Sequence, residues 1–317
     1  MTATRPEARL EVSARLGPDE VTAVLALLDA VTEADGVSPL SEHVMLHLRY
    51  GGDTDARHIL ARETDEGRQD RLVGYGHIDP TDKVEGSAAE LAVHPAARRH
   101  GVGRSIVARM IDESPDGRLR LWAHGQHPGA SKLAHELGFE RERILWQMRR
   151  SLFSPIPAPH VPDGIRLRTF VPGQDERAWT EVNNRAFAEH PDQGHWGIEE
   201  IQTREQEPWF DPAGFILAER DTGELVGFHW TKVHGGKSSH NGHVHEPIGE
   251  VYVVGVDPSA RGLGLGATLT LAGLRHLRSL GLSQAMLYVD ESNTTAIKLY
   301  DGLGFTRWDI DVGFVRG

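Results

Sequence analysis

Residues 249–266 read GEVYVVGVDPSARGLGLG, and residues 88–104 contain a shorter version of the same pattern, AAELAVHPAARRHGVGR. In both copies an apolar run typical of a buried strand ends at a proline, and an arginine and two glycines follow before a helical pattern begins. A strand that turns in this way into a helix gathers backbone N–H groups and the positive end of the helix dipole in one concavity. Each copy therefore predicts a phosphate-binding turn.

Two common nucleotide-binding turns do not fit this stretch. A Rossmann turn has the pattern Gly-x-Gly-x-x-Gly after the first strand of a βαβ unit, whereas residues 264–269 read GLGATL after a later strand. A P-loop ends in Gly-Lys followed by Ser or Thr, which is absent here. The turn belongs to another class of phosphate site.

The similarity extends on both sides of the turn, so the chain contains an internal repeat. With Pro95 placed on Pro258, RLVGYGHI (71–78) aligns with ELVGFHWT (224–231). Further along, ASKLAHELGFERER (130–143) aligns with AIKLYDGLGFTRWD (296–309). Chance would not keep both the order and the spacing of these matches.

A proline-rich segment separates the two copies. SLFSPIPAPHVPDG (151–164) contains four prolines and has no periodicity, which predicts an extended tether. We expect three parts: an N-terminal domain over residues 1–150, a linker over 151–163 and a C-terminal domain over 164–317.

Hydrophobic periodicity predicts mixed α/β domains, each with a mixed twisted sheet flanked by helices. The expected strands cover residues 9–16, 165–170 and 284–290, and the expected helices cover 19–34, 175–190, 267–281 and 293–305. Residues 214–233 predict a hairpin that turns at Asp221, Thr222 and Gly223.

Composition excludes several classes of protein. The chain of 317 residues has 46 Asp and Glu against 34 Lys and Arg, which argues against a nucleic-acid partner. No apolar run approaches the length that a membrane span needs, and we expect a soluble, cytoplasmic monomer. The absence of cysteine excludes disulfides, thiolate metal sites and a cysteine nucleophile.

A cluster of histidines raises the question of a metal site. His234, His240, His243 and His245 crowd a segment rich in Gly, Ser and Asn, and imidazoles are common zinc ligands. The segment has the composition of a hairpin loop without fixed geometry, so we expect no metal.

The motifs resemble the GNAT superfamily of acetyl-CoA-dependent N-acetyltransferases. The resemblance rests on the strand that ends Val-x-Pro, on Arg-x-x-Gly-x-Gly, and on Asn-x-x-Ala-x-x-x-Tyr-x-x-x-Gly-Phe, which begins at Asn293 and ends at Phe305. Longer strings look like the mycothiol synthase family, the tandem GNAT enzymes of actinobacteria, and the resemblance runs over most of both halves. These strings include AFAEHPDQGHW (186–196), EPWFDPAGFILA (207–218) and LYVDESNTTA (287–296).

The resemblance implies a reaction. Acetyl would pass from acetyl-CoA to the cysteinyl amine of a cysteine-glucosamine-inositol conjugate, and the product would be mycothiol. Attack needs a neutral amine, and the reference pKa of an α-amino group is about 7.7–8.0, so a base assists at neutral pH. Glu250, expected on one strand face with Tyr252 and Val254, suits that role. Tyr300 corresponds to the family's general acid.

The resemblance also assigns binding residues. Contacts with the amine substrate are implied for Glu42, Asp192, Lys232, Glu250 and Tyr288. Acetyl-CoA binding in the C-terminal copy is implied for Val254, Gly255, Val256, Arg261, Gly262, Leu263, Gly264, Leu265, Gly266, Ala267, Asn293, Thr294, Thr295, Ala296, Ile297 and Lys298. In the N-terminal copy it is implied for Leu91, Ala92, Val93, Arg99, His100, Gly101, Val102, Gly103 and Arg104.

The two copies differ where the chemistry would occur. Tyr300 aligns with Ala134 and Glu250 aligns with Ser87, while Glu90 is expected opposite Val253, on the other strand face. We therefore expect the N-terminal domain to hold acetyl-CoA without transferring from it. Two alternatives stay open, namely a GNAT enzyme for another amine, such as an aminoglycoside or a protein N-terminus, and a non-catalytic acyl-CoA sensor.

Overall fold

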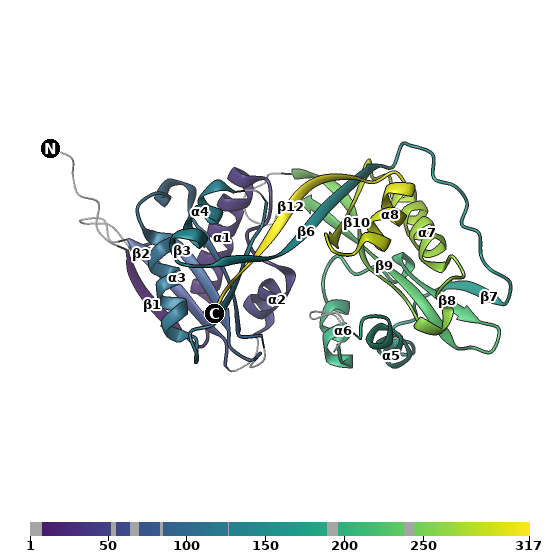
Figure 1. Ribbon diagram of the computed structural model, residues 1–317, viewed down its shortest axis with the longest axis horizontal. Coiled ribbons are helices and arrows are strands. Elements are labelled where there is room, and N and C mark those ends of the chain that lie inside the picture. The colour runs from purple at the N-terminus through teal and green to yellow at the C-terminus, as the bar shows by residue number, and fades with distance from the viewer. Residues whose placement is uncertain are drawn as a thin grey trace. The chain divides into compact units, whose positions relative to one another are not determined.

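The computed structural model describes residues 8–51, 55–63, 70–82, 85–125, 127–188, 196–237 and 244–317. The chain forms two compact units (Figure 1). The first comprises Met1–Leu145 together with Asp309–Gly317, and the second comprises Trp146–Trp308. These limits differ from the expected domain boundaries, because the end of the chain belongs to the first unit.

The first unit is a mixed sheet between two helical layers, with the strand order β1-β2-β3-β4-β5-β12. Its strands are β1 (Arg9–Ser13), β2 (Arg57–Glu63), β3 (Arg71–Asp79), β4 (Ser87–Val93), β5 (Leu119–Ala123) and the end of β12 (Thr306–Arg316). Its helices are α1 (Pro18–Asp35), α2 (Glu42–Tyr50), the 3₁₀ turn η1 (Pro95–Ala97), α3 (Val102–Glu113) and α4 (Pro128–Glu136).

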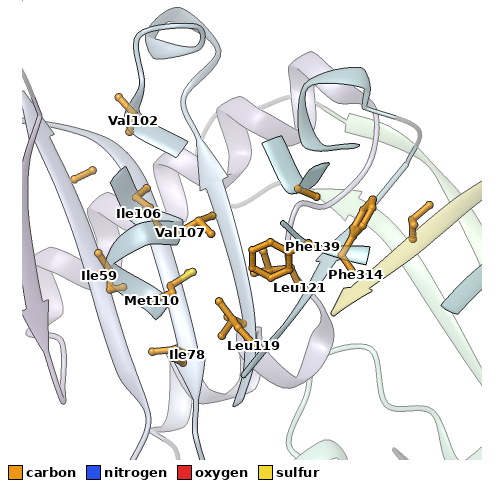
Figure 2. Close-up of a cluster of buried hydrophobic side chains, with 14 of the residues drawn as sticks. Ile59, Ile78, Val102, Ile106, Val107, Met110, Leu119, Leu121, Phe139 and Phe314 are labelled. Atoms are coloured by element: carbon orange, nitrogen blue, oxygen red, sulfur yellow. The ribbon is translucent and has the colours of Figure 1, made fainter. Parts of the chain in front are cut away.

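The helices α1 and α2 cover one face of this sheet, and α3 and α4 cover the other. Val24 of α1 and Val44 of α2 are buried against Tyr75 of β3. On the opposite face, Ile106 and Met110 of α3 pack in a cluster with residues from the strands (Figure 2). Phe314 of β12 joins that cluster, so the last strand of the chain completes the core of the first unit.

The second unit repeats this plan with the strand order β6-β11-β10-β9-β8-β7. Its strands are the end of β6 (Glu140–Ser151), β7 (Ile165–Thr169), β8 (Phe215–Arg220), β9 (Leu225–Lys237), β10 (Val244–Val256) and β11 (Gln284–Asp290). Its helices are α5 (Glu176–Ala186), α6 (Ile198–Glu205), η2 (Pro212–Gly214), η3 (Pro258–Ala260), α7 (Leu265–Ser279) and α8 (Thr294–Gly302).

Two helical layers also cover the second sheet, with α5 and α6 on one face and α7 and α8 on the other (Figure 1). An aromatic cluster that includes Trp179 and Trp230 fills the α5/α6 side. Aliphatic residues such as Leu274 and Leu287 fill the α7/α8 side. The hairpin of β8 and β9 and the strand over residues 284–290 are confirmed, whereas the helices expected over 175–190 and 293–305 end earlier, at Ala186 and Gly302.

The proline-rich segment packs against the second unit. Leu152 and Ile156 are buried in its aliphatic core. The hydroxyl of Thr268 on α7 donates to the carbonyl of His160 at 2.5 Å, and Arg275 donates to the carbonyl of Ile156 at 3.3 Å. The segment is therefore extended, as its prolines predict, but it lies along α7 rather than acting as a free tether.

A β-bulge in β10 overturns two expectations about strand faces. The antiparallel register with β9 shifts between Val251 and Val253, so Tyr252 is an extra residue and the alternation of faces changes there. Tyr252 and Val253 both pack on the α5/α6 side, whereas Val254 packs on the α7 side. Val254 therefore does not share a face with Glu250, and the alternation predicted from sequence is wrong beyond the bulge.

The same bulge also overturns the predicted strand face of Glu90 in the first unit. Its strand β4 pairs with β3 without any shift over the described register. The carboxylate of Glu90 accepts a hydrogen bond at 2.6 Å from the N–H of Ser41, which caps α2, so Glu90 faces the α1/α2 side. Its counterpart Val253 faces the corresponding α5/α6 side, which is the side of Glu250. The expectation that Glu90 lies on the other face is wrong.

Candidate functional site

The strands β10 and β11 pair only briefly at the centre of the second unit. Parallel partners are Gly249 with Ala285 and Glu250 with Met286, and the register continues no further along the two strands. Backbone groups of buried strands need hydrogen-bond partners. The end of β10, Val254–Val256, therefore has no β11 partner in this register, and the end of the pairing, the gap between the two strands, leaves its backbone groups on that side open to a ligand.

The turn that follows β10 has the geometry of an anion site. Gly262 and Gly264 both hold left-handed backbone, with φ of 83° and 76°. Gly264 is the N-cap of α7 and makes no side-chain capping bond. A Cβ built on either glycine would meet nothing within 4 Å, so the surface over the turn is open. The N–H groups at the start of α7 are thus available to a phosphate.

The corresponding turn in the first unit has the same left-handed backbone conformation. Arg99 and Gly101 have φ of 67° and 87°, and Gly101 is the uncapped N-cap of α3. Arg98 beside them is bound by Asp35 through two contacts of 2.7 Å. The turn geometry is therefore retained, while the charge of Arg98 is matched by a carboxylate of α1.

A groove of about 360 Å³ opens over this turn in the first unit. It is lined by the predicted acetyl-CoA residues of this copy, His100 excepted, and by Leu121–His124 of the neighbouring strand region. Ala134, at the position of Tyr300, is also part of the lining. The groove lies over the predicted cofactor residues, and it presents a methyl group where the second unit has a phenol.

Three of the predicted substrate residues of the second unit lie on one face of its sheet. Lys232 of β9 is the cross-strand partner of Glu250 on β10. Tyr288 lies two residues beyond Met286, the partner of Glu250 on β11, and so points to the same side. The relative exposures are 7% for Glu250, 8% for Lys232 and 40% for Tyr288, so two buried charges sit beside an accessible phenol.

Aromatic rings hold the buried ammonium of Lys232. Its Nζ lies 4.3 Å from the ring centroid of Trp209 and 5.0 Å from that of Tyr252. The hydroxyl of Tyr252 accepts a hydrogen bond at 2.8 Å from Nε of Arg204 on α6. Cations held over ring faces are attracted by the ring quadrupole, which fixes Lys232 beside Glu250.

Tyr300 lies on the opposite side of the sheet, in the α7/α8 core. It is 7% exposed, and its ring meets that of Phe305 at 5.9 Å in an edge-to-face contact. Burial raises the pKa of Tyr300 to about 12, so the hydroxyl keeps its proton at neutral pH. At the start of the same helix, the side chain of Asn293 accepts from the N–H of Ala296 at 3.1 Å and caps α8.

Other predicted residues are placed differently. Glu42 is the first residue of α2 in the first unit, and its part in the substrate site stays a prediction. Asp192 lies outside the described residues, as do His240 and His243. Within the described parts of the chain, no group of three or more His, Asp or Glu side chains could hold a metal ion.

Two residues of this face were missed by the sequence analysis. His234 follows Lys232 by two positions, and its Nε2 contacts Oε2 of Glu250. The strand alternation would have placed it there, but the residue was considered only as a metal ligand. Gln147 of β6 donates from Nε2 to the hydroxyl of Tyr288 at 2.8 Å. No local pattern signals that contact, because 141 positions separate the two residues.

Comparisons with known proteins agree with this geometry. The Acetyltransferase (GNAT) family profile matches residues 177–305, and the Acetyltransferase (GNAT) domain profile matches residues 55–141. A mycothiol acetyltransferase of Streptosporangium roseum is 56% identical, covering 96% of this chain and 98% of the relative. The corresponding protein of Acidothermus cellulolyticus is 53% identical, covering 100% and 97%.

A solved structure shows the same tandem fold. A tandem GNAT protein from the clavulanic acid biosynthesis pathway superimposes with a TM-score of 0.69 at 22% identity, covering 97% of this chain and 98% of that chain. Both units are thus GNAT folds, and the GNAT enzymes use acetyl-CoA as cosubstrate. No helix within the described residues has the length and apolar character of a membrane span. The chain is an acyltransferase and belongs to the mycothiol acetyltransferase family of tandem GNAT proteins.

Proposed function

We propose that the second unit transfers acetyl from acetyl-CoA to the cysteinyl amine of a cysteine-glucosamine-inositol conjugate, which yields mycothiol. The observation that carries the proposal is the pairing of buried Glu250 with Lys232 on one sheet face, beside the gap between β10 and β11. The family resemblance and the names of the relatives supply the identity of the amine.

Glu250 acts as the general base in this proposal. The amine nitrogen attacks the thioester carbonyl, and Glu250 accepts the proton that the nitrogen loses. Its place on the sheet supports the role, because Glu250 is the last residue of β10 that pairs with β11 before the gap begins. A base at that point lies next to the strand segment to which the thioester is assigned.

Tyr300 acts as the general acid. As the carbon–sulfur bond breaks, its phenol donates a proton to the departing sulfur, and the product is free CoA. The high pKa of Tyr300, caused by burial, keeps the proton in place until a thiolate develops beside it. The same pKa makes the phenol a weaker acid than the thiol it forms, so the transfer is coupled to the cleavage of the carbon–sulfur bond and to reprotonation of Tyr300 by solvent.

The first unit, we propose, holds acetyl-CoA without transferring from it. Its groove and left-handed turn favour binding. It has Ala134 in the place of Tyr300, so the groove lining has no hydroxyl there to protonate a leaving thiolate. Binding without turnover is the expected behaviour of such a site.

A direct assay of product tests the proposed function. The protein is incubated with acetyl-CoA and the cysteinyl conjugate, and mass spectrometry follows the addition of one acetyl group. Reaction of the product with a maleimide distinguishes N-acetylation, which leaves the thiol free, from S-acetylation. An aminoglycoside and a peptide with a free N-terminus serve as competing amines. Acetylation of either one in preference to the conjugate would refute the proposal, and acetyl-CoA binding without any product would indicate a sensor.

The cellular location and the oligomeric state of the enzyme are also proposals. We propose that it works in the cytoplasm, where acetyl-CoA is made, and as a monomer. Light scattering at micromolar concentration tests the second point, and a mass of twice 35.0 kDa would contradict it.

A further inference from the structure

We propose that His234 is the proton relay of Glu250, through which the general base returns the amine proton to solvent. The inference rests on the proposed function, since it assumes that Glu250 takes that proton. His234 is then a positioning residue, because it acts on the reaction through Glu250 and needs no contact with substrate.

The contact between the two side chains is the first observation. Nε2 of His234 on β9 contacts Oε2 of Glu250 on β10. Ile248 is the direct cross-strand partner of His234, and Lys232 is that of Glu250, so the histidine reaches Glu250 diagonally across the strand pair. The imidazole therefore contacts one of the two carboxylate oxygens, Oε2.

His234 is more exposed to solvent than Glu250, as a relay from a buried base to solvent requires. The side chain of Glu250 is 9% exposed, whereas that of His234 is 36% exposed. A buried base that has taken a proton must lose it before the next turnover. His234 joins the buried carboxyl to solvent, with one ring nitrogen on Glu250 and part of the ring in water.

Two cations of this face cannot replace the histidine. Lys232, held over Trp209 and Tyr252, and Arg204, bound to the hydroxyl of Tyr252, are both cations. In their charged forms both are donors without an acceptor atom, so neither can take a proton from Glu250. Imidazole has an acceptor nitrogen in its neutral form and a second nitrogen that can release a proton.

The step balances in protons. When the new C–N bond forms, the amine proton moves to Glu250, and the C–S bond breaks as Tyr300 protonates the sulfur. Glu250 then passes its proton to Nε2 of His234 in its Nδ1–H tautomer, the imidazolium releases the Nδ1 proton to water, and proton exchange of the partly exposed ring with solvent restores the Nδ1–H tautomer. Both Glu250 and His234 return to their starting charge, while solvent reprotonates Tyr300.

Two variants with imidazole rescue test the relay. His234→Ala removes the ring and opens space, and His234→Gln keeps a hydrogen-bond partner for Glu250 but cannot relay a proton. We expect kcat to fall about 10²-fold in both, the low end of what a positioned base contributes, with the KM for acetyl-CoA unchanged. Added imidazole should raise the rate of His234→Ala with saturation and leave His234→Gln slow. Wild-type turnover in His234→Gln, or no rescue of His234→Ala, would overturn the relay.

A matched histidine provides the control. His276 on α7 forms a similar pair with Asp211, Nε2 to Oδ2 at 3.0 Å, on the opposite side of the sheet. His276→Ala should keep its activity and show no response to imidazole. A response there would mean that imidazole acts on the reaction in general, and the rescue would count against the relay.

Glu250→Gln separates this inference from the proposed function. If Glu250→Gln retains full rate, Glu250 is not the base and the proposed mechanism fails. If Glu250→Gln is inactive while both His234 variants turn over normally, the base is supported and the relay alone fails. If the mass spectrometry assay finds no acetylated conjugate with the wild-type protein, the proposed function fails whatever the variants do.

Discussion

Arg99 in the first unit and Gly262 in the second hold the same left-handed backbone, with φ of 67° and 83°. Among the described residues, Arg99 is the one non-glycine with positive φ. Such backbone is costly for a residue with a Cβ and costs glycine little. The first unit thus keeps the shape of the phosphate turn at a position where its own side chain opposes that shape, which supports anion binding in both units.

This relationship predicts that two substitutions differ in their effect on stability. Gly262→Ala should lower the free energy of unfolding by about 1 kcal/mol, since left-handed backbone disfavours a Cβ by about that amount. The new methyl group meets nothing within 4 Å, so backbone strain alone accounts for the loss. Arg99→Gly should not lower the stability. Urea denaturation measures both, and an unchanged midpoint in Gly262→Ala would contradict the argument.

Removing the base should abolish turnover while preserving cofactor binding. Glu250→Gln is expected to lower kcat by about 10²- to 10⁴-fold, the contribution of a positioned general base. Calorimetry should still find the wild-type affinity for acetyl-CoA. Glu246→Gln is the matched control, because Glu246 lies on the same strand, is exposed and bonds to Ser283 at 2.7 Å. Equal loss in both variants would argue against a specific role for Glu250.

The two tyrosines of the second unit should affect different kinetic constants. Tyr300→Phe keeps the ring that packs on Phe305 and removes the proton donor, so kcat should fall by about 10²-fold or more with KM unchanged. Tyr288→Phe removes the hydroxyl that Gln147 binds, so the KM for the amine should rise instead. Steady-state kinetics distinguishes the two patterns, and a pure KM effect in Tyr300→Phe would refute its role as acid.

Blocking one turn at a time should separate the two cofactor sites. Gly103 and Gly266 occupy equivalent places in the first turns of α3 and α7, and a Cβ on each meets a leucine at 3.4 Å. Gly103→Trp should remove one CoA-binding event with little loss of rate. Gly266→Trp should remove the other event together with activity. If Gly103→Trp also abolishes turnover while circular dichroism shows a folded protein, the first unit contributes to catalysis.

Buried histidines should make stability fall in acid. Burial lowers the pKa of His77 in the first unit to about 3, and that of His229 in the second to about 4. In the unfolded chain these histidines gain a proton near pH 6.5, but the folded protein does not bind it, so unfolding is favoured as the pH falls below 6.5 toward 4. Each histidine contributes a slope of up to about 1.4 kcal/mol per pH unit.

A single variant isolates one of these contributions. His77→Gln should flatten the dependence of stability on pH between 6.5 and 4.5, measured by urea denaturation at each pH. His135→Gln is the control, because His135 is exposed on α4. If the His77 variant keeps the wild-type slope, another group is responsible for the acid sensitivity.

Local sequence patterns determined much of the fold of this protein. The spacing of Arg261, Gly264 and the apolar positions of α7 predicted a strand, a phosphate turn and a helix, because each depends on neighbours a few residues away. The repeat predicted two such units. The absence of a phenol at Ala134, and the presence of Glu250 and Tyr300 in the second copy, are also readable without coordinates.

Only the tertiary structure decided the features that depend on distant pairing. The bulge at Tyr252 turns Val254 away from Glu250, and no residue type in β10 marks the position of the extra residue. The end of the last strand pairs with β5 of the first unit, and local sequence cannot predict this pairing because about 190 positions separate the partners, such as Val312 and Ala123. The contact of His234 with Glu250 likewise requires the register of β9 on β10, which sequence periodicity does not contain.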